Sequence, residues 1–178
     1  MKLKPSDPLL GAAKVLIILS QIVMIFAMVM MGIGIGALLT VGYAELAGKV
    51  AEAGAPPYTF WLIVLAMLTG MAILSLAVKF LRELTGIIDS VDQGDPFHPL
   101  NAKRLSRMGW ISVIGHALIL PIMALAMWVA PYMEAAHNDS HITGGIDFGM
   151  ILLTLILFIL ARVFKRGAEM REELEGTV

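Results

Sequence analysis

One short segment of the chain gathers side chains of the kind that bind metal ions. His137, Asp139 and His141 lie within five consecutive residues, between two long apolar stretches. Histidines four residues apart share one face of a helix, and neutral imidazoles are good ligands for zinc and copper. A polar loop in contact with water often contains the same residue types by chance. The spacing therefore leaves two interpretations open, a metal site or a solvated loop.

His116 is the one histidine inside a long apolar stretch. An ionisable side chain at membrane depth is a candidate for proton transfer or ligand binding. A neutral imidazole can instead bond a backbone carbonyl or a neighbouring helix, so a purely structural role is the alternative. Haem bound across a helix bundle would need a second buried histidine, and the other apolar stretches have none. We therefore expect no cofactor.

Sequence motifs of common enzymes are missing. The chain has no phosphate-binding glycine loop, no GxSxG and no HExxH. It also has no cysteine, which excludes disulfides, thiolate metal sites and cysteine catalysis. The net charge of -1 provides no general basicity for binding nucleic acid directly. These features predict a protein that is not an enzyme.

Three aspartates recur at a spacing of three residues. Asp89, Asp92 and Asp95 precede a proline and follow a segment with helical spacing of apolar residues. Three interpretations fit them: a divalent cation site, ion pairs with Lys103 and Arg104, or a surface that docks a partner protein.

Four long apolar stretches must position these side chains. They span residues 15–43, 58–80, 110–132 and 146–164. A helix needs about 20 apolar residues to cross the hydrocarbon of a bilayer, and each stretch is about that long. The composition agrees, since 58% of residues are hydrophobic and only 15% are charged. We predict an all-α fold: one domain, residues 1–178, forming a four-helix bundle in the lipid bilayer. The first stretch is too long for a cleaved signal peptide, so we expect it to be retained.

The basic residues alternate with the apolar stretches. Twelve of the thirteen Lys and Arg residues lie before the first stretch, between the second and third, or after the fourth, when Lys79 and Arg162 near the ends of the second and fourth stretches are counted with the segments that follow them. Short loops rich in Lys and Arg stay in the cytoplasm. The pattern therefore predicts that both termini and the middle connection are cytoplasmic. Aromatic residues that favour the membrane boundary agree, and those expected at the outer boundary are Tyr43, Tyr58, Trp61, Trp128 and Tyr132.

The middle connection has signs of a helix, a turn and a second helix. The helical spacing predicts an amphipathic continuation of the second span that stops near Gly94, where a left-handed cap is easy. Pro96 disfavours a helical residue before it, and Pro99 suits the first turn of a new helix. On the other side, residues 44–53 are expected to extend the first span as a helix.

Two pairs of small residues suggest close helix packing. Gly32 and Gly36 are four apart in the first span, and Ala66 and Gly70 are four apart in the second. Such pairs allow helix backbones to approach closely. They fit packing within the bundle or, alternatively, the seam of a homodimer.

Parts of the middle connection and the tail resemble a known family. The residues that carry the resemblance are Gly94-Asp95-Pro96-Phe97, Asn101-Ala102, Arg104-Leu105 and Gly109-Trp110, then Phe164, Arg166-Gly167, Met170, Glu173, Thr177 and Val178. The pattern is similar to that of a bacterial membrane family, domain of unknown function 2975, although Gly176 stands where a larger apolar residue is expected. The resemblance implies a four-span protein of the bacterial cytoplasmic membrane. It also implies a small helix-turn-helix regulator encoded nearby, and no biochemical activity.

The resulting functional hypothesis is an interaction or regulatory membrane component. It would present the middle connection to a cytosolic helix-turn-helix regulator. The candidate partner-binding residues are Asp89, Asp92, Asp95, Pro96, Phe97, Asn101 and Arg104. Two alternatives are a small transporter or channel acting as an oligomer, and a membrane scaffold or immunity-like protein.

Overall fold

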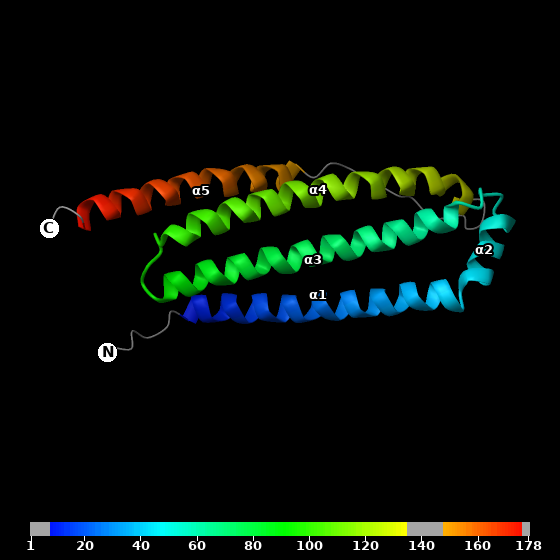
Figure 1. Cartoon of the computed structure of the whole chain (residues 1–178), viewed down its shortest axis with the longest axis horizontal. Coiled ribbons are helices and arrows are strands. Elements are labelled where there is room, and N and C mark those ends of the chain that lie inside the picture. Colours follow the sequence, from blue (N-terminus) through cyan, green and yellow to red (C-terminus); the bar gives the residue numbers. More distant parts are fainter. Residues whose placement is uncertain (1–7, 135–147, 176–178) are drawn as a thin grey trace. The chain divides into compact units, whose positions relative to one another are not determined.

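The computed structural model describes residues 8–134 and 148–175, and every element in these ranges is an α-helix. The helices are α1 (Pro8–Thr40), α2 (Tyr43–Glu52), α3 (Thr59–Asp92), α4 (Pro99–Glu134) and α5 (Phe148–Glu175), as labelled in Figure 1. Helices α1, α3, α4 and α5 are long and apolar enough to cross a membrane, which is the architecture expected of a multi-pass membrane protein. The all-α prediction is therefore confirmed.

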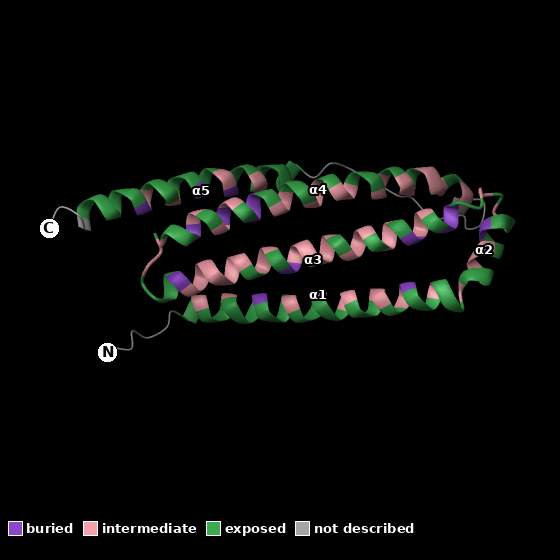
Figure 2. Ribbon diagram, viewed as in Figure 1, coloured by how far each residue is buried: buried purple, intermediate pink, exposed green. Residues whose placement is uncertain are grey.

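Large apolar side chains cover much of the surface of these helices. Figure 2 shows α1 and α5 as mostly exposed along their described lengths. Leu16, Val23 and Phe26 of α1 are each 65% exposed. An apolar surface this extensive is unfavourable in water but is the normal surface of a helix in contact with lipid. The helices thus have the outer surface that a bilayer requires.

The helix predicted over residues 44–53 is present as α2, but it does not continue the first long helix. Helix α1 ends at Thr40, and α2 begins separately at Tyr43. The amide of Gly42 bonds the carbonyl of Ala37, and the chain bends so tightly that a Cβ at Gly42 would lie 3.2 Å from the Cα of Leu38. Glycine at this position permits the bend, which interrupts the helix.

Glycine also ends two helices as left-handed caps. Gly94 has a φ of 81°, its amide bonds the Val91 carbonyl, and the amide of Asp95 bonds the Ser90 carbonyl. This pair of bonds is the Schellman motif, which satisfies the last carbonyls of a helix. Gly54, with a φ of 69°, ends α2 in the same way. The predicted stop of the second helical segment near Gly94 is confirmed.

The start of α4 also follows the prediction. Pro99 is its first residue, where a missing amide hydrogen costs nothing. His98 caps the helix, because its Nδ1 accepts a hydrogen bond from the amide of Leu100 at 3.2 Å. The short segment between Gly94 and Pro99 is therefore fixed at both ends by local backbone chemistry. We call residues 93–98 the α3–α4 turn.

The helices form two compact units. The first comprises Met1–Met24, Leu76–Ile114 and Asp147–Val178, and the second comprises Ile25–Ser75 and Gly115–Ile146. The core of the first unit is a cluster of Leu105, Met108, Leu157 and Ala161. Side chains of α3 and α5 pack against it: Phe80, Leu84, Ile87 and Phe164. This apolar cluster holds α3, α4 and α5 together next to the α3–α4 turn.

The second unit contains α2 and all five aromatic residues expected at the outer membrane boundary. Tyr58 stacks on Trp128 with ring centroids 5.7 Å apart, and Tyr43 meets Phe60 edge to face at 4.8 Å. In α2 the Lys49 ammonium donates to Glu45 at 2.7 Å, and this hydrogen bond and charge lower the pKa of Glu45. Such an i,i+4 pair supports a short surface helix.

Small residues pack within the second unit. A Cβ at Gly32 of α1 would lie 3.5 Å from the Cε of Met71, and one at Gly70 of α3 would lie 3.7 Å from the Cε of Met31. The terminal methyl groups of Met31 and Met71 therefore occupy the space that these glycines leave between α1 and α3. At Gly36 a Cβ would meet no atom within 4 Å. The packing interpretation thus applies to Gly32 and Gly70, while a homodimer seam at Gly36 stays a prediction.

Candidate functional site

Asn101, in the first turn of α4, is the central residue of the contacts that hold the α3–α4 turn. It is completely buried, although its side chain is polar. Its Nδ2 donates to the Oγ of Ser90 at 2.5 Å and to the carbonyl oxygen of Pro96 at 2.9 Å, and its Oδ1 accepts from Arg104 at 2.9 Å. A buried amide with all these bonds satisfied stabilises one arrangement of the chain. Asn101 therefore joins the end of α3, the turn and the start of α4.

Arg104 extends this network to Gly86, near the C-terminal end of α3. Its Nη1 donates to the Gly86 carbonyl oxygen at 2.7 Å as well as to Asn101. A Cβ at Gly86 would lie 2.7 Å from both Cζ and Nε of Arg104, so the guanidinium lies directly against the glycine. Glycine is thus needed here for close approach of a side chain, although its φ is ordinary.

Phe97 connects the turn to α5. Its ring lies 5.5 Å from the ring of Phe164, and a Cβ at Gly167 would come within 2.6 Å of its Cδ1. The aromatic ring therefore fills the space that Gly167 leaves on α5. Even so, Phe97 remains 41% exposed.

Ion pairs connect the turn region to both ends of the described chain. Asp95 pairs with Arg171 of α5, and Asp89 pairs with Lys14 of α1 at 2.6 Å. The interpretation of these aspartates as ion-paired residues thus holds for Asp89 and Asp95, but with Lys14 and Arg171 as partners instead of Lys103 and Arg104. Arg104 bonds the Gly86 carbonyl and Asn101. Surface pairs of this kind contribute about 0–1 kcal/mol each, so they orient the helices more than they stabilise them.

Several side chains around the turn are exposed. We call this set the turn surface, and it consists of Val91, Asp92, Gln93, Phe97 and Leu100. Three of these are apolar and one is a carboxylate. Of the predicted partner-binding residues, Asp92 and Phe97 belong to this surface. Asn101 and Arg104 instead form the network beneath it.

Two groups of residues were candidates for binding a metal ion, one around His137 and one around Asp89. His137, Asp139 and His141 lie outside the described residues. In residues 8–134 and 148–175, no three His, Asp or Glu side chains group as ligands for a metal ion. Asp89 and Asp95 are oriented instead by Lys14 and Arg171.

His116 belongs to a different part of the structure. It lies in α4 within the second unit, where it is half-buried. The contacts of the α3–α4 turn all lie in the first unit. His116 is therefore separate from the candidate site.

Sequence reasoning missed three residues that shape the site. The guanidinium of Arg104 lies against Gly86, and the ring of Phe97 lies against Gly167. The hydroxyl of Ser90 accepts a hydrogen bond from Asn101 and donates one to the Ile87 carbonyl at 2.7 Å. A glycine in a helix interior costs about 1 kcal/mol relative to alanine, which is a usable sign that something packs closely there. Nothing in the sequence identifies the residue that does so.

No curated protein matches the chain, and no solved structure matches it. Residues 42–178 match the model of a family described as Protein of unknown function (DUF2975). The matched segment includes α2 to α5 and the whole α3–α4 turn. It covers well over half of the chain, and it agrees with the resemblance seen in the turn and the tail. The chain therefore belongs to the DUF2975 family of proteins of unknown function.

Proposed function

We propose that this protein is a regulatory component of the bacterial cytoplasmic membrane that binds a cytosolic protein through the turn surface. In this proposal both termini and the α3–α4 turn are cytoplasmic, and the four long helices cross the bilayer. The charge pattern supports the orientation, because Arg82, Lys103 and Arg107 flank the turn.

The observation that carries the proposal is the burial of Asn101 beneath exposed residues. Its bonds to Ser90, Pro96 and Arg104 hold the α3–α4 turn in one conformation. A surface that is already ordered loses little conformational entropy when a partner binds. The fixed frame thus supports a recognition role for the side chains that it presents.

The chemistry of the turn surface indicates the kind of partner. Phe97 and Leu100 are exposed apolar side chains, 41% and 44% exposed, and Asp92 supplies a negative charge beside them. A matching surface would combine an apolar patch with a basic side chain. The resemblance to the family names a small helix-turn-helix regulator as the candidate, and such regulators carry basic residues for DNA.

The test is direct binding between the reconstituted protein and that regulator. The full chain is placed in lipid nanodiscs, and the purified regulator encoded beside it is titrated by biolayer interferometry. We expect saturable binding that weakens at least about fivefold in Asp92→Lys and in Leu100→Ser, because central interface residues contribute more than ~1 kcal/mol each.

A matched control uses an exposed carboxylate elsewhere. Glu52 ends α2 in the second unit, so Glu52→Lys makes the same charge change away from the turn. We expect it to leave binding unchanged. Equal weakening by Glu52→Lys and Asp92→Lys, or the absence of binding to the wild-type protein, would refute the proposal.

A further inference from the structure

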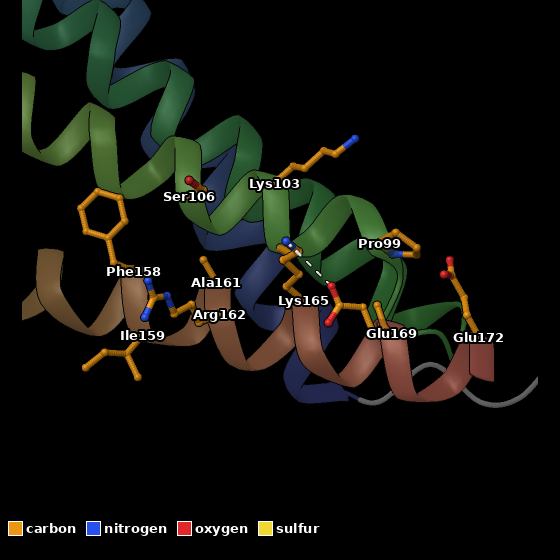
Figure 3. Close-up of a pocket in the computed structure, with 12 residues that line it drawn as sticks. Pro99, Lys103, Ser106, Phe158, Ile159, Ala161, Arg162, Lys165, Glu169 and Glu172 are labelled. Carbon is orange, nitrogen blue, oxygen red and sulfur yellow. Dashed lines mark ion pairs between the residues drawn. The ribbon is translucent and has the colours of Figure 1, made fainter. Parts of the chain in front are cut away.

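A groove lies between α4 and α5 in the first unit. Its volume is about 800 Å³, which is within the range of ~300–1,000 Å³ typical of small-molecule sites. One wall is formed by α4 and the other by α5, as Figure 3 shows. The residues used below are Lys103 and Ser106 of α4, and Phe158, Ile159, Arg162 and Lys165 of α5.

The groove is apolar at one end. Phe158 and Ile159 line this end, and the Phe158 ring packs so closely on α4 that a Cβ at Gly109 would lie 2.9 Å from it. Trp110 meets the same ring edge to face with centroids 5.8 Å apart. The Phe158 side chain extends toward α4 in Figure 3. An acyl chain is the kind of group that fits beside these side chains.

The middle of the groove is basic. Arg162 and Lys165 come from α5, one and two helical turns beyond Phe158, and Lys103 comes from α4. Lys165 lies 3.8 Å from Glu169, which is a loose pair. Among the residues that the structure describes, Lys103 and Arg162 have no acidic partner. Glu169 and Glu172 line the far end, so the positive charge is confined to the middle.

A second groove in the same unit provides a comparison. It lies between α3 and α4, has a volume of about 370 Å³, and also contains three basic residues: Lys79, Arg82 and Arg107. There, however, Glu83 accepts from Arg107 at 2.9 Å and neutralises part of the charge. The α4–α5 groove is larger, and its two carboxylates lie at one end of it instead of among the basic residues. The two grooves thus differ in size and in how the charged residues are arranged along them.

We propose that the α4–α5 groove binds one anionic phospholipid. The phosphate of the headgroup lies beside Arg162 and Lys165 of α5, and an acyl chain follows Phe158 and Ile159. Basic pockets between membrane helices are suited to anionic headgroups, and the order of apolar and basic residues along α5 matches the order of chain and headgroup in a lipid. A free phosphate would leave the apolar end unused. This site does not depend on the partner protein proposed above.

The test compares two lipids with identical acyl chains, phosphatidylglycerol and phosphatidylcholine. Each is titrated against the detergent-solubilised full chain, and bound lipid is counted by native mass spectrometry. We expect the first bound lipid to be phosphatidylglycerol. Each basic side chain near an anionic lipid is worth roughly fivefold in affinity, so the double variant Arg162→Gln with Lys165→Gln should bind phosphatidylglycerol about 25-fold more weakly.

Two further double variants are controls. The first tests whether general surface charge explains the binding, and the second tests whether loss of binding reflects misfolding. Lys79→Gln with Arg82→Gln removes two charges from the other groove and should keep the preference for phosphatidylglycerol. Arg162→Lys with Lys165→Arg keeps the charge and should also keep the preference.

Three results would overturn the proposal. One is equal weakening by the two neutralising double variants, which would indicate only general attraction. Another is equal binding of the two lipids by the wild-type protein. The third is displacement of phosphatidylglycerol by glycerol 3-phosphate at the same concentration, which would show that the apolar end contributes nothing.

Discussion

The guanidinium of Arg104 lies against Gly86 of α3, with its Nη1 2.7 Å from the Gly86 carbonyl oxygen. Any side chain at position 86 would occupy the space of the guanidinium, since even a Cβ would be 2.7 Å from Cζ. We predict that Gly86→Ala displaces Arg104 and destabilises the protein by about 1–3 kcal/mol. Thermal unfolding in detergent, followed by tryptophan fluorescence, measures the effect.

The control for this substitution is Gly115→Ala in α4. A Cβ there would meet no atom within 4 Å, and alanine stabilises a helix interior by about 0.5–1 kcal/mol relative to glycine. The melting temperature should therefore stay the same or rise. If Gly86→Ala behaved like Gly115→Ala, the close contact with Arg104 would be wrong.

Replacement of Asn101 should loosen the α3–α4 turn. Asn101→Ala leaves buried bonding groups of Ser90, Pro96 and Arg104 without their partner, and each such group costs roughly 1–3 kcal/mol. We expect faster hydrogen exchange in the turn and a lower melting temperature. Asn101→Asp should not rescue the protein, because a carboxylate cannot donate to the Pro96 carbonyl. Gln93→Ala removes an exposed amide from the same turn and should change stability by no more than about 0.5 kcal/mol.

Phe97 and Gly167 should be energetically coupled. Gly167→Ala places a methyl group where the Phe97 ring lies, within 2.6 Å of Cδ1. We predict that Gly167→Ala destabilises the wild-type protein but has little effect when Phe97 is already alanine. A double-mutant cycle on unfolding free energies should give a coupling of about 0.5–3 kcal/mol. Additive effects of the two substitutions would mean that the ring does not rest on α5.

The proposed orientation can be tested with single cysteines, because the chain has none of its own. Gln93→Cys in the turn and Ala51→Cys in α2 are both at exposed positions. We predict that a membrane-impermeant maleimide labels Ala51→Cys on intact spheroplasts and labels Gln93→Cys only in inverted vesicles. Labelling of both cysteines from one side would contradict the proposed topology.

Local features of the fold could be predicted because they depend on nearby backbone chemistry. Gly94 and Pro99 fix the end of α3 and the start of α4 through a left-handed φ and a missing amide hydrogen, whatever the rest of the chain does. The length and apolarity of the four long helices are equally local properties. The bend at Gly42 was missed, because the apolar stretch continues through it and the tight contact with Leu38 appears only in three dimensions.

The roles of the site residues could not be predicted in the same way. Asp89 and Lys14 are 75 positions apart, and Asp95 and Arg171 are 76 apart, so their pairing follows from helix packing. Asn101 and Arg104 are polar residues next to a turn, which usually indicates exposure. Their partners on α3 are a carbonyl oxygen and a serine hydroxyl, and the sequence does not reveal which buried groups need a donor.

Phe97 and Asp95 have a joint consequence for how the molecule responds to its ligands. Both belong to the α3–α4 turn, and both are attached to α5, one through Gly167 and the other through Arg171. Displacing the turn therefore requires contacts on α5 to break, and displacing α5 requires contacts of the turn to break. By thermodynamic reciprocity, any molecule whose affinity depends on the position of α5 must alter the affinity of whatever binds the turn, by an equal factor in each direction.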